Sequence, residues 1–442
     1  MDNSVEKLPK AGGLTRIPWT VLAALAVTGH LAWAVENTWF GTFAYDRIRP
    51  DMSIVATMTS VTAIVATLTT ILMGTLSDRS RSKWGKRRPF IFLGYIFWGL
   101  MTALFPLSAL VKNTGLAVML VVVIDSLMTF FGSTANDAAF NAWTAEITPP
   151  SKRGKVEGVL NVCLFVAQII SYTLAGMLID RFDYFIFFYI LGGVVMLVGF
   201  LAARKLPEAE VAAQDQPQTS FLADLKDLFR WQTVKENPEL FKLLLMIMIS
   251  SIGMQVCLPY LVIYVENYLG FSKTEFGLIG AAIMVGSLLI SLPFGLLADK
   301  LNRKWMLVVA ILMSSVGCFM FAQVKSLPLL ALAGFIWQAF YVGVSIASVS
   351  WLKDLLPKNT QGRFLGLRMV FWIMIPMIFG PWIAVWAMGS QTVSALTVQT
   401  GQFVPEPIIF VVGALISALA IVPLFFLKGG NQHLKPNGNH DA

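Results

Sequence analysis

The chain has 442 residues, of which 56% are hydrophobic and only 13% are charged. A soluble globular protein carries about twice that share of charged residues, so a surface that mainly faces water is excluded. The net charge of +8 would suit a nucleic-acid partner. The positive residues, however, gather in short loops between apolar segments, which is typical of membrane proteins.

Apolar runs of about 20 residues recur along the chain, each long enough to cross a hydrocarbon core of about 30 Å. Residues 1–16 are polar, and the first run continues through a full span, so we expect no cleaved signal peptide. The twelve predicted spans are residues 17–43, 53–76, 90–111, 116–147, 158–180, 184–203, 240–267, 274–298, 305–324, 327–355, 365–388 and 408–427.

Lysine and arginine residues follow the even-numbered spans, with six of them in the segment 79–88. Residues 389–407, between two later spans, contain none. Because positive loops stay in the cytoplasm, this asymmetry predicts that both termini are cytoplasmic. We therefore expect a multi-pass protein of the cell membrane.

Residues 204–239 interrupt the apolar pattern with a polar stretch followed by an amphipathic FLADLKDLFRW. This segment is predicted to be a cytoplasmic linker ending in a surface helix, and it serves either as a passive tether or as a regulatory site. It separates an N-terminal bundle of six helices (17–203) from a C-terminal bundle (240–427), with tails at 1–16 and 428–442.

Short motifs recur in the two halves. GTLSDR (74–79) after the second span matches GLLADK (295–300) after the eighth, and PPSKRGKVEG (149–158) matches PKNTQGRFLG (357–366). Two independent matches indicate a duplicated structure. In transporters built from repeats, the substrate site lies between the halves near the membrane midplane.

The segment GTLSDRSRSKWGKRRPFIFLG (74–94) resembles the loop motif of the major facilitator superfamily. Its SKWGKRRPFI run (82–91) resembles the glycoside–pentoside–hexuronide:cation symporters and plant sucrose transporters. NDAAFNAWTAEIT (136–148) aligns without gaps with the fourth helix of melibiose permease-like members. The resemblance implies an all-α integral membrane fold, with twelve transmembrane helices in two pseudo-symmetric six-helix bundles.

The loop motif has a predicted gating role. Gly74 would permit close helix approach, and Asp78 would cap a helix N-terminus or pair with a cation, which favours one gate state. The alternative is charge that sets the topology, together with loop packing. The residues assigned to gating are Gly74, Asp78, Arg79, Arg88, Gly295 and Asp299.

Asp137 is the strongest candidate for a transport role, because an ionisable residue within a span is costly. The resemblance implies that this helix-4 aspartate contacts the sugar and lies near the cation. Thr134, Asp137, Asn141 and Thr144 are predicted to share one helix face. Such a stripe suits a ligand with many hydroxyl groups, which both donate and accept hydrogen bonds. A polar clamp between helices is the alternative.

His30, Trp33 and Asn37 are predicted to share a face of the first span, with Glu36 beside them. His30 or Glu36 could bind and release a proton, and Trp33 could stack on a sugar ring. A packing histidine and a glutamate at the water boundary are the alternatives. Asp125 stands alone in an apolar run of the fourth span.

Polar residues of three further spans could complete the cavity, although such residues also join helices within membranes. We expect substrate contacts from Asn161, Gln255, Gln338 and Tyr341.

The chain departs from the melibiose permease-like pattern. The family's paired span-2 aspartates correspond to Ala66 and Thr70, and its span-5 arginine falls near Asn161. Its span-11 lysine falls in the apolar run 374–376. Without these groups, a proton is favoured over sodium as the coupling ion, through His30, Glu36 or Asp137.

The predicted function is secondary active symport of a sugar or glycoside with a proton or, less favoured, a sodium ion. The alternative is a facilitator-type uniporter or exporter of a non-sugar metabolite or amphipathic compound. The sequence shows no catalytic motif, so we expect neither an enzyme nor a cofactor. Its three cysteines all lie in apolar runs and predict neither a disulfide framework nor a metal site. We expect a monomer in contact with membrane lipid, without a nucleic-acid partner.

Overall fold

The computed structural model describes residues 17–207, 231–355, 366–389 and 403–428. These residues form helices and loops and contain no strand. In the N-terminal half the helices are α1 (Trp19–Val35), α2 (Gly41–Arg47), α3 (Met52–Asp78), α4 (Arg88–Leu104), α5 (Thr114–Gly132), α6 (Asn141–Ile147) and α7 (Arg153–Lys205). In the C-terminal half they are α9 (Trp231–Glu236), α10 (Pro238–Cys257), α11 (Leu261–Ile263), α12 (Lys273–Lys300), α13 (Arg303–Gln323), α14 (Leu327–Leu355), α16 (Ile375–Gly389), α18 (Ile408–Leu419) and α19 (Ile421–Phe425).

Several of these helices join into longer spans. π-helical segments connect α1 to α2 (Glu36–Phe40) and α5 to α6 (Ser133–Phe140), and a third (Val370–Met374) precedes α16. Shorter connections run through Phe105–Leu110 after α4 and Leu258–Tyr260 after α10.

The helix α7 contains two membrane crossings. Its 53 residues would extend about 80 Å as one straight helix, more than twice the thickness of a hydrocarbon core. The backbone breaks at Asp183, where φ is 70° and ψ is 165°. The eleven apolar helices long enough to cross a membrane therefore provide twelve crossings in the described residues, as the sequence predicted.

Local sequence explains where several helices begin. The Asp51 carboxylate accepts a hydrogen bond from the Ser53 amide (2.8 Å) at the start of α3, and Asn113 caps α5 in the same way. Ser272 and Glu275 form a reciprocal capping box at the start of α12. The first span ends at Arg47 instead of the predicted residue 43, and Tyr45 in this added turn has a hydrogen-bond partner in the other half.

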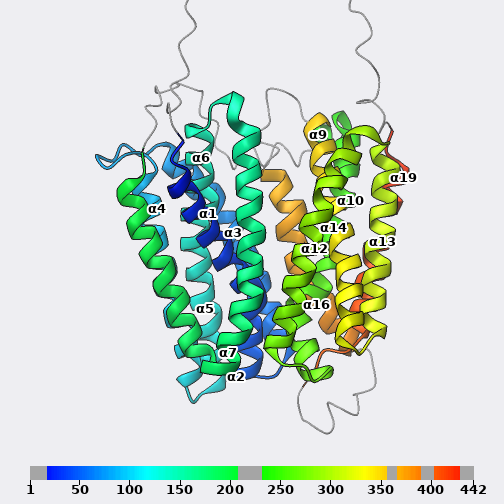
Figure 1. Cartoon of the computed structure of the whole chain (residues 1–442), viewed down its shortest axis with the longest axis horizontal. Coiled ribbons are helices and arrows are strands. Elements are labelled where there is room, and N and C mark those ends of the chain that lie inside the picture. The colour runs from blue at the N-terminus through cyan, green and yellow to red at the C-terminus, as the bar shows by residue number, and fades with distance from the viewer. Residues whose placement is uncertain (1–16, 208–230, 356–365, 390–402, 429–442) are drawn as a thin grey trace, which may run out of the picture.

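The two halves form separate bundles that pack together on one side of the molecule (Figure 1). We call the side on which the described chain begins and ends the terminal side, and the opposite side the distal side. The linker expected at 204–239 is shortened by α7, which continues to Lys205, and by α10, which begins at Pro238. Most of its predicted amphipathic helix lies outside the described residues, as do both tails.

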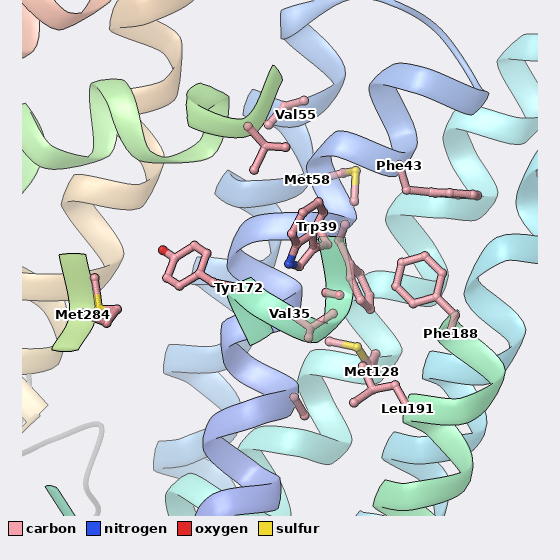
Figure 2. Packing of buried hydrophobic residues seen from close by; sticks show 14 of the residues in the cluster. Val35, Trp39, Phe43, Val55, Met58, Met128, Tyr172, Phe188, Leu191 and Met284 are labelled. Atoms are coloured by element: carbon pink, nitrogen blue, oxygen red, sulfur yellow. The ribbon is translucent and has the colours of Figure 1, made fainter. Parts of the chain in front are cut away.

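Buried aromatic side chains join the two halves on the distal side. Trp39 and Tyr172 of the N-terminal half both contact Phe276 of α12, with ring centroids 6.0 and 5.7 Å apart. Figure 2 shows Tyr172 extending toward Met284, away from the cluster formed by Trp39, Phe43 and Phe188. One hydrophobic core therefore continues from one bundle into the other, whereas a second core lies within the C-terminal bundle.

Hydrogen bonds also close the distal side. The Tyr260 hydroxyl lies 3.1 Å from both the Met52 and the Pro381 carbonyl oxygens, so it can donate to either. Tyr45 donates its hydroxyl proton to the Phe403 carbonyl oxygen (3.1 Å). The structure is thus held shut at its distal side by contacts between the halves.

Charged groups reinforce this closure. Lys273 at the start of α12 is only 8% exposed in its side chain and pairs with Asp46 of the other half, at 3.1 Å, and with Glu266. Asp180 of α7 accepts hydrogen bonds from the backbone and the hydroxyl of Thr274, at 2.8 and 2.6 Å. The N-terminus of α12 is therefore bound to the N-terminal half.

On the terminal side, the two repeated glycines face open space. A methyl group added at Gly74 or Gly295 would meet no atom within 4 Å. The close helix approach expected at Gly74 is therefore absent in this conformation, because the distal side is the one on which the bundles meet.

Candidate functional site

The terminal-side loop motif is organised around Arg87, which is 3% exposed. Its guanidinium pairs with Asp78 and donates to Glu146 Oε1 (2.6 Å) and to Ser77 Oγ (2.5 Å). Burial opposes the charge of Arg87, but the hydrogen bonds and charges of Glu146 and Asp78 outweigh it and raise the pKa of Arg87. Asp78 therefore pairs with a cation, one of the two roles predicted for it.

The sequence prediction named the neighbouring Arg79 and Arg88 and missed Arg87. Arg88 donates to the Leu206 carbonyl oxygen (2.6 Å), which ties α4 to the end of α7, and Arg79 is exposed at the end of α3. A signal for Arg87 was present, because its partner Glu146 has an acidic counterpart, Asp354, three residues before the proline of the repeated motif.

The C-terminal half repeats this arrangement, with Arg303 paired to Asp354 and 6% exposed. Gly295 lies in α12, and the side chain of Asp299 is outside the described part of the structure. The duplication predicted from the loops therefore extends to a buried arginine–carboxylate pair in each half.

Asp137 lies in the π-helical segment of the fourth span and is half-buried. Asn136 Nδ2 donates to its Oδ1 at 3.3 Å, and Asn141 Nδ2 donates to its backbone oxygen at 3.1 Å. The Trp33 and Ser133 side chains also lie close to this carboxylate, although Trp33 Nε1 and Ser133 Oγ have no partner at hydrogen-bonding geometry. Asp137 and the exposed Asn141 thus form a polar surface with unused hydrogen-bonding capacity.

The predicted four-residue stripe is only partly accessible. Thr134 and Thr144 are 5% and 7% exposed, and the Thr134 hydroxyl donates to the Phe130 backbone. The π-helical turn is wider than an α-helical turn, so the regular spacing used in the prediction does not hold across it. Asp137 and Asn141 remain as the accessible pair.

The first span lies beside this region, with Trp33 close to Asp137. Trp33 packs against Trp98 with ring centroids 5.0 Å apart, and Asn37 is exposed and donates to the Trp33 backbone oxygen (2.7 Å). His30 is half-buried one turn earlier. The Trp33 indole is therefore already in contact with another ring, at an interplanar angle of 48°.

Glu36 and Asp125 line a common cavity of about 30 Å³, together with Asn37 and Gln255. The Thr129 hydroxyl lies 2.9 Å from Glu36 Oε1. The sequence prediction included Glu36 but left Asp125 out of the site, because nothing in the apolar run around Asp125 shows that α5 places it beside the first span.

The remaining predicted residues lie on different helices of the two halves. Asn161 is exposed on α7, whereas Tyr341 lies near Ser251 and Trp372 within the C-terminal half. Gln338 lines a second cavity, of about 50 Å³, whose other walls are mainly apolar and include Trp337. The structure therefore does not gather all predicted substrate residues into one pocket.

Neither metal nor disulfide chemistry is present among the described residues. No cluster of three or more histidine, cysteine, aspartate or glutamate side chains there could hold a metal ion. The three cysteines are free and buried, with Cys257 Sγ and Cys318 Sγ 3.8 Å apart.

Comparisons with known proteins bear on both sequence and fold. The sequence matches the Major Facilitator Superfamily over residues 20–268 and 243–441. An uncharacterized MFS-type transporter, YuxJ of Bacillus subtilis, is 26% identical over 226 residues, which cover 51% of this chain and only 57% of YuxJ. The quinolone resistance protein NorA of Staphylococcus aureus is 30% identical over 149 residues, or 33% of this chain and 37% of NorA.

Solved transporter structures share the fold. A single-substitution mutant of the nucleoside transporter NupG superposes with a TM-score of 0.74 at 14% identity, covering 92% of this chain and 99% of that one. A D-xylose-proton symporter gives a TM-score of 0.69 at 13% identity, with 94% and 99% covered. At these identities the likeness is one of fold.

Proposed function

Because the chain belongs to the major facilitator superfamily, we propose that it is a secondary active transporter that imports a sugar or glycoside together with a proton. Alternating access would carry the solute between the two bundles, and the terminal side would be cytoplasmic, as the distribution of positive loop residues predicts. Proton and solute need only prefer the same conformational states to be coupled.

The observation that carries this proposal is the polar surface of Asp137 and Asn141 beside Trp33. The carboxylate accepts hydrogen bonds, the amide both donates and accepts, and an indole offers an apolar face of the kind that sugar C–H groups contact. The resemblance of residues 136–148 to the fourth helix of melibiose permease-like symporters supports a sugar. The fold shared with a D-xylose-proton symporter is consistent with it.

A second candidate is the transport of an amphipathic compound. The cavity at Gln338 favours it, because its lining is mainly apolar and includes Tyr172, Phe276 and Trp337. The similarity to NorA over part of the chain points the same way. The polar surface of Asp137 and Asn141 argues for the sugar, because its carboxylate and amide groups match hydroxyl groups, which both donate and accept hydrogen bonds.

A binding panel separates these two candidates. The thermal unfolding of the purified full-length protein would be followed with monosaccharides, disaccharides, aryl glucosides, nucleosides and a quinolone. A ligand at 100 times its Kd stabilises the folded protein by about 2.7 kcal/mol. We expect a sugar or glucoside to raise the midpoint.

Substitutions then locate the site. D137N should abolish the stabilisation by that sugar, whereas E157Q, which neutralises an exposed carboxylate at the start of α7, should preserve it. Stabilisation by the quinolone and by no sugar or glucoside would overturn the sugar assignment in favour of the second candidate.

A further inference from the structure

The cavity that holds Glu36 and Asp125 lies on the seam between the two bundles. Its walls come from the first span and α3 on one side, and from Gln255, Pro259 and Met377 on the other. Pro259 is adjacent to Tyr260, whose hydroxyl bonds close the distal side. The cavity is therefore immediately inside the distal closure, where separation of the bundles would expose it to the opposite compartment.

Each of the two acids has an oxygen without a partner. Asp125 is 2% exposed. Its Oδ1 and Glu36 Oε2 are both buried atoms without a hydrogen-bond partner. A buried ionised carboxylate is very costly unless it is paired with a cation or hydrogen-bonded. Two such groups around a cavity of about 30 Å³ would also repel one another strongly if both were ionised.

In the described part of the chain, the helices around the pair carry positive side chains only near their ends. In α3, α5, α10 and the segment 366–389, lysine and arginine are either missing or confined to the terminal-side ends. The other titratable groups on the packed elements are His30 on the first span, Tyr95 of α4, whose hydroxyl donates to the Leu25 backbone oxygen (3.0 Å), and Asp137 on the fourth span. Asp137 is near enough for its charge to act on Glu36 and adds negative charge.

The Thr129 hydroxyl can form a hydrogen bond with either the protonated or the ionised form of Glu36. Its Oγ1 lies 2.9 Å from Glu36 Oε1 and also 2.9 Å from the Asp125 backbone oxygen. A hydroxyl has one proton to donate and two lone pairs to accept with. It donates to an ionised Glu36, and it accepts from a protonated Glu36 while it donates to the Asp125 backbone.

We infer that Glu36 and Asp125 share one proton and form the binding site of the coupling proton, with Thr129 as its positioning residue. The proton comes from water when the cavity is open and returns to water from the same oxygens, so the charge of the pair alternates between −1 and −2. A proton on the pair also lowers the repulsion felt at Asp137, which links proton binding to the proposed solute site. The inference rests on the proposed function.

Infrared spectroscopy of the full-length protein in nanodiscs tests the shared proton without any sugar. We expect a C=O stretching band of a protonated, buried carboxyl group at about pH 7, which disappears in strongly alkaline buffer. The double variant E36Q/D125N should lose this band. Each single variant should shift or remove it, because the partner that shares the proton has changed.

Two matched variants, each of which removes one hydroxyl group from α5, control for an effect of misfolding on the band. T129V should shift the band, whereas S126A should leave it unchanged, because Ser126 on the same helix donates only to the Val122 backbone. A band that persists in the double variant, or that D125N leaves unchanged in position and intensity, would overturn the shared proton. Loss of the wild-type band on adding sodium chloride would assign the pair to sodium and overturn it as well. If the band behaves as expected but no sugar is bound, the proposed function fails and the proton pair stands.

Discussion

Replacing Lys273 with methionine should open the distal side. The ammonium group of Lys273 joins the two halves through Asp46, at 3.1 Å, and also pairs with Glu266. A hydrogen bond to a charged group contributes about 1.5–3 kcal/mol, and its loss would leave two carboxylates facing each other without a cation. Since 1.4 kcal/mol changes a ratio about tenfold, the ratio of distal-closed to distal-open protein should fall by about 10- to 100-fold.

Cysteine labelling on the terminal side measures this ratio. G74C makes a suitable reporter, because a side chain at this position meets open space in the distal-closed conformation and the three native cysteines are buried. We expect a water-soluble maleimide to react more slowly with the reporter in K273M than in the parent protein. K112M removes an exposed lysine from a distal-side loop and should leave the rate unchanged. Equal rates in K273M and K112M would refute the role of Lys273 in the closure.

Two further substitutions test the terminal side. R87Q should destabilise the protein by about 1.5–3 kcal/mol in detergent, because it removes the charged hydrogen bonds from Arg87 to Glu146, while Lys86 stays 3.5 Å from that carboxylate. R79Q is the exposed control, and equal unfolding midpoints for the two variants would contradict a stabilising role of Arg87. G74L should change stability by less than about 0.5 kcal/mol, since the added side chain meets open space, and should slow solute exchange by obstructing closure of the terminal side. G193L, at another glycine with open space around it, should not slow exchange, and equal exchange rates in the two leucine variants would show that Gly74 does not enter the closure.

Hydropathy was sufficient to predict the arrangement of spans, because a membrane crossing has a fixed minimum length of apolar residues. It also separated the two crossings of α7, which the turn at Asp183 confirms. The π-helical segments at Glu36–Phe40 and Ser133–Phe140 were not predicted, because the sequence pattern was read with α-helical spacing throughout. That is why the expected stripe around Asp137 is only partly accessible.

The acid pair shows what a single sequence leaves open. Glu36 and Asp125 are far apart in the chain, and only the packing of α5 against the first span brings Thr129 within 2.9 Å of Glu36. The loop motif shows the same limit, because adjacent arginines at 87 and 88 differ in burial and partner, not in residue type. Residue types indicated the chemistry, whereas tertiary contacts selected the residues.

The most direct test of the account is uptake of labelled sugars into proteoliposomes under an imposed pH gradient. With proton-coupled import, the sugar which stabilises the protein accumulates when the lumen is alkaline, and a protonophore abolishes the accumulation. E36Q and D125N should still exchange that sugar across the membrane without accumulating it. Accumulation that is insensitive to both the pH gradient and the protonophore would contradict proton-coupled transport.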